Sequence, residues 1–185
     1  KKFSKFKDKI EYVVLENEPE GLIYEDDNTK KESHLNWRFN SVKRIAFQRN
    51  ELFESVNKIA DYDDYIMYSD NDEIPNLDLF DPKNNKNKIT IFEQDLFYYK
   101  FNLLCDRIKW YGTRIIKKKD LINFEWLRQI KPKKYPFYRI DTFFKKDRYM
   151  NLEIIRNGGW HFTRMISPEE IHKKELDTEH HDEYR

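Results

Sequence analysis

The feature that most constrains the fold is a short apolar run that passes directly into a cluster of carboxylates. Residues 65–68 (YIMY) read as a buried strand, and residues 69–73 (SDNDE) follow without a break. Pro75 then stops regular structure. Asp70 and Asp72 therefore stand at the carboxyl end of a strand, which is where open α/β sheets bind their ligands.

Two carboxylates at this spacing suit a divalent cation. In an extended chain, residues i and i+2 point to the same side, so Asp70 and Asp72 are expected to face one ion. Their oxygens suit Mg²⁺ or Mn²⁺, and such an ion can neutralise a diphosphate. A polar loop after a strand is the commoner origin of so short a motif. The preceding helix and the Pro-limited turn make the case for a cation site stronger here than for the bare motif.

The hydrophobic pattern predicts an α/β fold. Apolar positions recur at helical spacing over residues 41–60, and further helices are expected at 121–130, capped by Asp120, and from Ser167 onward. Strands are expected at residues 10–15, 65–68, 89–101, 136–140 and 152–155. No linker or repeat divides the chain. We therefore expect a single domain over residues 1–185, an α/β sandwich with a mostly parallel sheet.

Composition limits the classes of partner. The 35 Lys and Arg nearly balance the 34 Asp and Glu, so net charge gives no general reason to bind nucleic acid or an anionic membrane. Aromatic residues make up 16% of the chain, which favours a folded domain despite 37% charged residues. Cys105 is the only cysteine, which excludes a disulfide framework. No apolar run approaches the ~20 residues of a membrane span.

Two more side chains are candidates for a ligand site. His161 follows two glycines, and strand alternation would turn it away from Trp160 and Phe162, although such a histidine is more often structural. Arg49 stands on the apolar stripe of the helix at 41–60 and needs an anionic partner. It could reach a phosphate or hold the Asp70 loop by a salt bridge, and the sequence leaves both open.

A basic stretch rich in aromatic residues raises a nucleic-acid alternative. Residues 117–119 and 131–148 could bind a single strand by backbone contacts and stacking. The same aromatics are needed for the core of so polar a chain, and that interpretation is favoured. Motifs for dinucleotide binding, P-loop hydrolysis, zinc proteolysis and serine hydrolysis do not occur.

Four segments together resemble the family 17 glycosyltransferases, whose best-known member adds the bisecting N-acetylglucosamine to N-glycans. They are residues 47–50 (FQRN), 63–75 (DDYIMYSDNDEIP), 110–113 (WYGT) and 158–163 (GGWHFT). The resemblance runs from about residue 5 to residue 183, and the second and fourth segments are specific when taken together.

The resemblance implies a GT-A-type, Rossmann-like α/β/α fold and an inverting transfer of N-acetylglucosamine from a UDP-sugar to a glycan hydroxyl. It implies that Asp70 and Asp72 hold Mn²⁺ or Mg²⁺, with His161 as a third ligand. The donor site would also include Arg49, Gly112 and Trp160. An inverting transfer needs a general base, and the candidates are Asp120, Glu125 and Asp141.

The sequence departs from the family pattern at its N-terminal end. Family members carry a nucleotide-binding strand before the region equivalent to residues 5–15, so we expect this sequence to be N-terminally truncated. A soluble cytoplasmic enzyme of bacterial or viral type is expected.

Two alternatives to the glycosyltransferase remain open. One is a metal-dependent nuclease or nucleic-acid-binding domain, built on Asp70 and Asp72, and the other is a non-catalytic sugar-binding relative.

Overall fold

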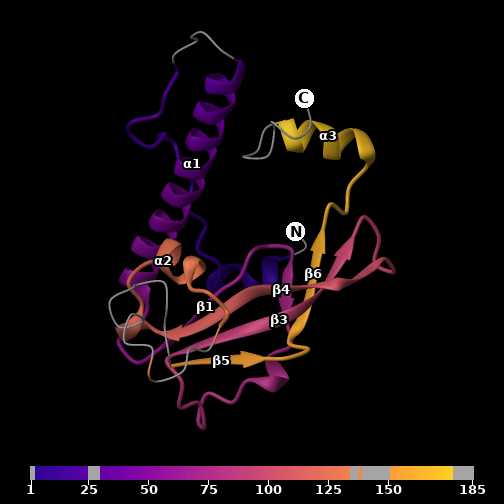
Figure 1. Ribbon diagram of the computed structural model, residues 1–185. Coiled ribbons are helices and arrows are strands. Elements are labelled where there is room, and N and C mark those ends of the chain that lie inside the picture. The colour runs from indigo at the N-terminus through magenta and orange to yellow at the C-terminus, as the bar shows by residue number, and fades with distance from the viewer. Residues whose placement is uncertain (1–2, 25–29, 134–137, 139–150, 177–185) are drawn as a thin grey trace.

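The computed structural model describes residues 3–24, 30–133, 138 and 151–176. In this part of the chain the strands are β1 (Tyr65–Tyr68), β2 (Glu73–Pro75), β3 (Ile89–Tyr98), β4 (Leu104–Lys117), β5 (Leu152–Ile155) and β6 (Gly159–Thr163). They form one sheet in the order β1-β4-β3-β6-β2, and β5 also pairs with β3 (Figure 1). The helices are α1 (Lys30–Ile59), α2 (Phe124–Gln129) and α3 (Pro168–Leu176), with 3-10 turns η1 (Ser4–Lys9), η2 (Leu77–Leu79) and η3 (Lys118–Asp120).

The sheet is mostly antiparallel, so the predicted mostly parallel sandwich is wrong, although the mixed α/β class is confirmed. Strand pairs β1–β4, β3–β4 and β2–β6 run antiparallel, and β5 and β6 run parallel to β3. The prediction assumed that helices connect successive strands, because parallel neighbours need a crossover of about a dozen residues or more. In the structure, a tight turn at residues 99–103 joins β3 to β4, and another at residues 69–72 joins β1 to β2.

The short link between β1 and β2 requires the sheet to curl. These strands lie at opposite ends of the sheet order, separated by β4, β3 and β6. In a flat sheet with strands about 4.8 Å apart, they would lie about 19 Å from each other. The chain from Tyr68 to Glu73 reaches at most about 18 Å when fully extended, and it turns instead, with the Glu73 N–H donating to the Asp70 carbonyl at 3.1 Å. Curling therefore brings Glu73 against β4.

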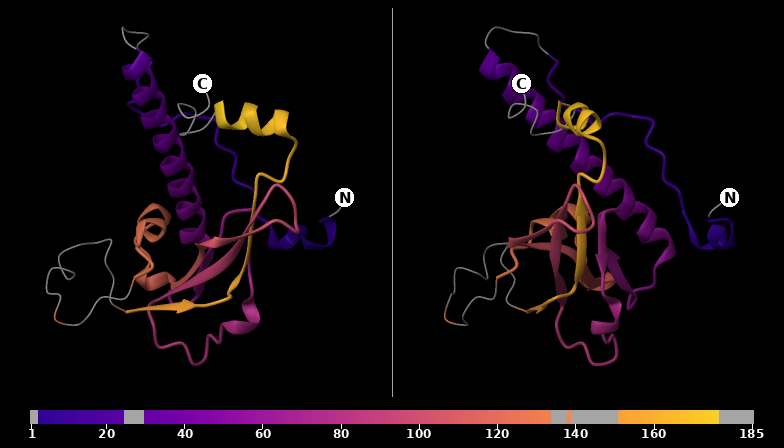
Figure 2. Two further views of the ribbon diagram at one scale, coloured as in Figure 1. Left: turned by 45° about the vertical axis from the view of Figure 1, so that its right-hand side comes forward. Right: turned by 90° about the vertical axis from the view of Figure 1, so that its right-hand side faces the viewer.

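Helices α1 and α2 cover the apolar core at the β1 side of the sheet. The sequence of α1 contains neither Gly nor Pro, and its C-terminal half brings Phe53 and Val56 against the core. Phe124 and Leu127 of α2 are buried there, next to Ile116 of β4. The N-terminal half of α1 projects beyond the sheet (Figure 2). The helix predicted at residues 41–60 is thus confirmed, and it begins earlier than predicted.

Among the described residues, no helix is both long enough and apolar enough to cross a membrane.

The predicted strand at residues 10–15 is wrong. These residues form no strand and pair with none of the strands in the described part of the chain, and Ile10, Tyr12 and Val14 are all more than half exposed. The chain after them returns along α1 instead, where the Asn40 side chain bonds both the N–H and the carbonyl of Ile23, at 2.9 and 2.8 Å. Residues with high strand propensity form a strand only where the edge of a sheet is available for pairing.

The predicted helix starts have different outcomes. Asp120 does not cap the helix at 121–130, because the side chain of Asn123 accepts the Trp126 N–H at 2.7 Å and α2 begins at Phe124. The capping box at Ser167 is confirmed. Ser167 Oγ accepts the Glu170 N–H at 3.3 Å, and the Glu170 carboxylate accepts the Ser167 N–H at 3.0 Å.

Two glycines at the start of β6 fix its position: Gly158 ends the connection from β5, and Gly159 is the first residue of β6. The Gly158 N–H donates to the Glu93 carbonyl at 2.7 Å, so the chain stays beside β3 between the two strands. Gly159 has a φ of 134°, and a Cβ there would lie 2.8 Å from Pro75 Cα and against the Ile74 carbonyl. A side chain at this position would therefore push β6 away from β2.

Gly159→Ala should lower the free energy of unfolding by about 2 kcal/mol or more, because the residue would be strained in φ and would clash with the β2 backbone. Chemical denaturation followed by circular dichroism measures this. Gly21→Ala is the matched control, because Gly21 also has a positive φ, of 70°, but its close neighbour is the flexible end of Lys43. Equal losses in the two variants would contradict the importance of the β2–β6 contact.

Candidate functional site

The site is built around the buried carboxylate of Glu73, the first residue of β2. Its side chain has no exposed surface. Oε1 accepts the indole N–H of Trp110 at 2.7 Å and a guanidinium N–H of Arg128 at 3.2 Å. Oε2 accepts the Thr113 hydroxyl at 3.4 Å and the Asp70 N–H at 3.3 Å. A buried charge is tolerated when it is hydrogen-bonded and paired in this way.

Asp70 lies in the turn between β1 and β2 and is already ion-paired. Its Oδ2 accepts from Arg128 Nη2 at 3.0 Å, and its Oδ1 accepts from the Tyr68 hydroxyl at 2.9 Å. Burial, and then the neighbouring Asp70, raise the pKa of Tyr68, so its hydroxyl keeps the proton that it donates. The Asp70 side chain is about a third exposed, at 35%.

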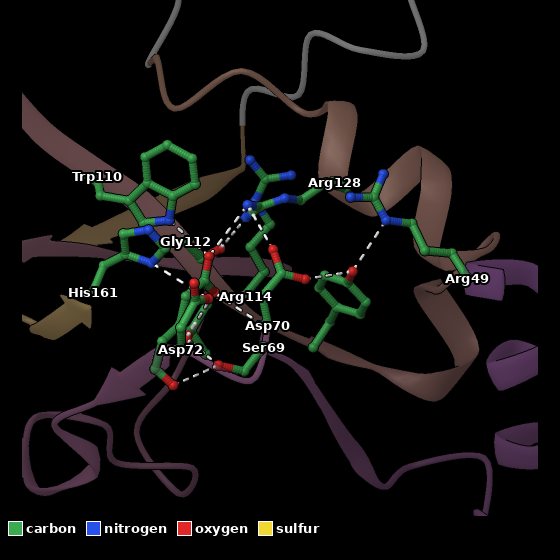
Figure 3. A network of polar contacts seen from close by, with 12 residues as sticks. Arg49, Ser69, Asp70, Asp72, Trp110, Gly112, Arg114, Arg128 and His161 are labelled. Atoms are coloured by element: carbon green, nitrogen blue, oxygen red, sulfur yellow. Dashed lines mark hydrogen bonds and ion pairs between the residues drawn. The ribbon is translucent and has the colours of Figure 1, made fainter. Parts of the chain in front are cut away.

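Asp72 and His161 face each other across the β2–β6 pair. Residues 71–72 form the turn before β2, and the Asp72 carbonyl accepts the Phe162 N–H at 2.9 Å. This contact places Asp72 Oδ1 3.7 Å from His161 Nδ1, which is too long for a hydrogen bond (Figure 3). Asp70 and Asp72 therefore take different partners, because the chain turns where the prediction assumed an extended strand.

His161 presents a buried nitrogen atom with no hydrogen-bond partner among the described residues. The atom is Nδ1, the one nearest Asp72, and the whole residue is only 6% exposed. Burial lowers the pKa of His161, against the opposing attraction of Asp72 and Glu73. A neutral imidazole whose Nδ1 makes no hydrogen bond to the described residues, and which lies beside a carboxylate, can accept a cation.

Trp110 stacks on His161, and the Arg128 guanidinium also lies over the Trp110 ring. The Trp110 and His161 rings are parallel within 16°, with centroids 4.5 Å apart. The Arg128 guanidinium lies 5.4 Å from the Trp110 ring centroid. In Figure 3, Trp110 and His161 lie together on one side of the carboxylates, and Arg128 lies above the carboxylates. These contacts connect α2, β4 and β6 at one place.

A second arginine, Arg114 of β4, lies almost completely buried beneath the site. It is 4% exposed, it donates to the Leu127 carbonyl, and its Nε has no hydrogen-bond partner among the described residues. Burial and the nearby Arg128 lower the pKa of Arg114 to about 10, so it remains charged at neutral pH. Arg114 therefore adds positive potential next to Arg128.

Arg49 holds the site from the side of α1, although it makes no direct ion pair with Asp70. It pairs with Glu125 of α2 at 2.7 Å and donates to the Tyr68 hydroxyl at 3.1 Å. Tyr68 in turn donates to Asp70. Of the two roles left open by the sequence, the structure thus shows a structural one, but it acts through Tyr68.

Gly112 lies where β4 passes closest to the Glu73 carboxylate. A Cβ at this position would lie 2.5 Å from the carboxyl carbon of Glu73 and against the Gln94 amide oxygen. The Gly112 carbonyl also accepts an N–H of Arg128 at 3.1 Å. Gly112 is therefore needed for packing around Glu73.

The remaining predicted residues lie elsewhere. Trp160 is 43% exposed, and strand alternation turns it to the opposite face of β6 from His161. Asp120 follows the end of β4 that pairs with Tyr65, at the far end of β1 from Asp70, and forms an ion pair with Lys88 at 3.2 Å. Asp141 and most of the basic stretch at 131–148 lie outside the described residues.

Within the described ranges, no three His, Cys, Asp or Glu side chains are gathered closely enough to hold a metal ion together. Two of the three predicted ligands, Asp72 and His161, face each other, and the third, Asp70, is engaged by Arg128. A cation here would need further ligands from a bound substrate or from water, which is the usual arrangement for Mg²⁺ bound with phosphates.

Sequence reasoning gave no role to Glu73, Arg114 or Arg128. Glu73 directly follows Asp72 of the acidic motif, and its position before Ile74 and Pro75 is the one sequence feature that could indicate a role for it in the site. Arg114 and Arg128 carry no local signal, because only the tertiary fold brings them to the carboxylates.

Comparison of the chain with family models, with curated proteins and with solved structures finds no match.

Glu73→Gln should lower the free energy of unfolding by about 3 kcal/mol, because it removes the fully buried one of the two carboxylates that compensate the poorly exposed Arg128. The measurement is denaturant unfolding at neutral pH. Asp95→Asn is the matched control, since Asp95 pairs with Lys109 where both side chains are about a third exposed or more, and it should cost less than about 1 kcal/mol. A loss for Glu73→Gln as small as that of the control would show that Glu73 is not the centre of the network.

Proposed function

We propose that the chain is a divalent-cation-dependent, inverting glycosyltransferase that moves N-acetylglucosamine from a UDP-sugar to a hydroxyl of a glycan acceptor. The proposal includes membership of the family 17 glycosyltransferases and a relation to the GT-A type of fold, without the mostly parallel sheet. The observation that carries it is the position of Asp72 opposite His161 Nδ1, which accepts or donates no hydrogen bond within the described residues. The pair stands at the end of the acidic motif, near two arginines.

The residues present fit a cation in part. Asp72 offers a carboxylate oxygen and His161 a neutral imidazole nitrogen on facing elements. The imidazole nitrogen favours a transition metal such as Mn²⁺ over Mg²⁺. Asp70 can join as a ligand once it is released by Arg128, and diphosphate oxygens and water would complete the coordination.

When bound, the ion supplies a Lewis acid that stabilises negative charge on the leaving diphosphate. The chain's own residues do the rest. Glu73 keeps Trp110 and Arg128 in place, and Arg114 contributes positive potential near the site. Preorganised charges of this kind stabilise charge that develops during a transfer.

Of the two described candidates for the general base, Glu125 is the better placed. It belongs to the network around Asp70, through Arg49 and Tyr68, whereas Asp120 lies at the other end of β1. A base must lie within hydrogen-bond reach of the acceptor hydroxyl. Glu125 lies on α2 at the edge of the site, where its side chain is 24% exposed and can meet an acceptor.

Calorimetric titration with UDP and UDP-N-acetylglucosamine, in Mn²⁺ and in EDTA, tests the proposal. The native chain should bind both ligands in Mn²⁺ and lose most of its affinity in EDTA. Asp72→Asn should weaken binding in Mn²⁺ by about tenfold or more, which is the size expected when a charged ligand of the ion is lost.

Asp78→Asn is the control, because it removes the same charge from an exposed position on η2. It should bind like the native chain. Binding that is equal in Mn²⁺ and EDTA, or equal in Asp72→Asn and the native chain, would refute the cation-dependent donor site.

A further inference from the structure

The contacts of Arg128 differ in how easily they can be replaced. Its guanidinium bonds the Gly112 carbonyl at 3.1 Å and Glu73 at 3.2 Å, and it lies over the Trp110 ring. These three partners belong to the sheet, and the Glu73 side chain is fully buried. The fourth partner, Asp70 at 3.0 Å, lies in a turn with 35% of its side chain exposed. Asp70 is thus the partner that solvent or a ligand can displace.

A cation beside Asp72 acts on that exposed contact. A divalent ion held by Asp72 and His161 would attract the Asp70 carboxylate and repel the Arg128 guanidinium, because both effects are strong at short range away from bulk water. The ion and Arg128 therefore compete for Asp70. The three contacts to the sheet hold Arg128 at the site while its bond to Asp70 is lost.

A phosphate group can replace the lost carboxylate. A guanidinium binds carboxylate and phosphate with the same fork of N–H donors. Arg114, charged and buried close by, raises the positive potential at the same place, and its nearness makes an unpaired Arg128 less favourable. An incoming diphosphate bound to the cation would restore the balance of charge that Asp70 had provided.

We infer that Arg128 exchanges Asp70 for the diphosphate of the donor when the cation binds. Arg128 is thus a diphosphate-binding residue, and in the absence of ligand it pairs with Asp70, which is one of the ligands of the cation. The inference rests on the proposed function. It identifies a residue on α2 as part of the donor site and gives the order in which charges are exchanged.

Arg128→Gln should change the affinity for Mn²⁺ and the affinity for UDP in opposite directions. Without nucleotide, Mn²⁺ should bind several-fold more tightly than to the native chain, because Asp70 no longer has a competing cation. In saturating Mn²⁺, UDP and inorganic pyrophosphate should bind about tenfold more weakly, the loss of one charge-assisted contact. Titration calorimetry gives both affinities. Arg107→Gln, at an exposed position of β4, removes the same charge away from the site and should change neither.

Arg128→Lys keeps the charge and lacks the planar fork. It should bind Mn²⁺ like the native chain and UDP more weakly, and a cooperative thermal transition in each variant confirms that it folds. If Arg128→Gln and Arg128→Lys weaken Mn²⁺ and UDP together, or change neither, the exchange is refuted while the donor site stands. If the native chain itself binds neither Mn²⁺ nor UDP, both the proposed function and the exchange fail.

Discussion

The buried carboxylate of Glu73 is the interaction on which the rest of the site depends. It has no contact with solvent, and it accepts hydrogen bonds from Trp110, Thr113, Arg128 and the backbone of Asp70. Through these four donors it joins β4, α2 and the acidic turn. Removing its charge would leave Arg128 with Asp70 as its remaining carboxylate partner in the network, and the loss of one member of a buried ion pair is costly. The base of the site is therefore closed to solvent at Glu73, whereas the side chains of Asp70 and Asp72 are each 35% exposed.

The curl of the sheet explains how distant parts of the sequence meet at Glu73. The short turn after β1 forces β2 back towards β4, and Gly159, the first residue of β6, lets β6 pack closely on β2. His161 then lies opposite Glu73 and stacks on Trp110. One region of the structure thus contains a carboxylate and a neutral imidazole, which suit a cation, and two arginines, which suit an anion.

The local parts of this arrangement were predictable from sequence. Apolar spacing predicts the strand at residues 65–68 and the helix at residues 41–60, which is part of α1. Hydrogen-bond chemistry predicts the capping box at Ser167. The parallel sheet was predicted wrongly, because strand direction depends on connection length and not on apolar spacing. The contacts of Arg128 could not be predicted, since they require the curl that brings α2 over β4. Residues 10–15 show the same limit, because strand propensity does not provide a pairing edge.

The central claim is that a cation binds between Asp72 and His161, and pulsed electron paramagnetic resonance of bound Mn²⁺ tests it most directly. Electron spin-echo modulation detects nitrogen atoms coordinated to the ion. The account predicts modulation from one imidazole nitrogen in the native chain and its loss in His161→Gln, while His172→Gln, at an exposed position on α3, keeps it. Tight Mn²⁺ binding without nitrogen modulation in the native chain would contradict the account.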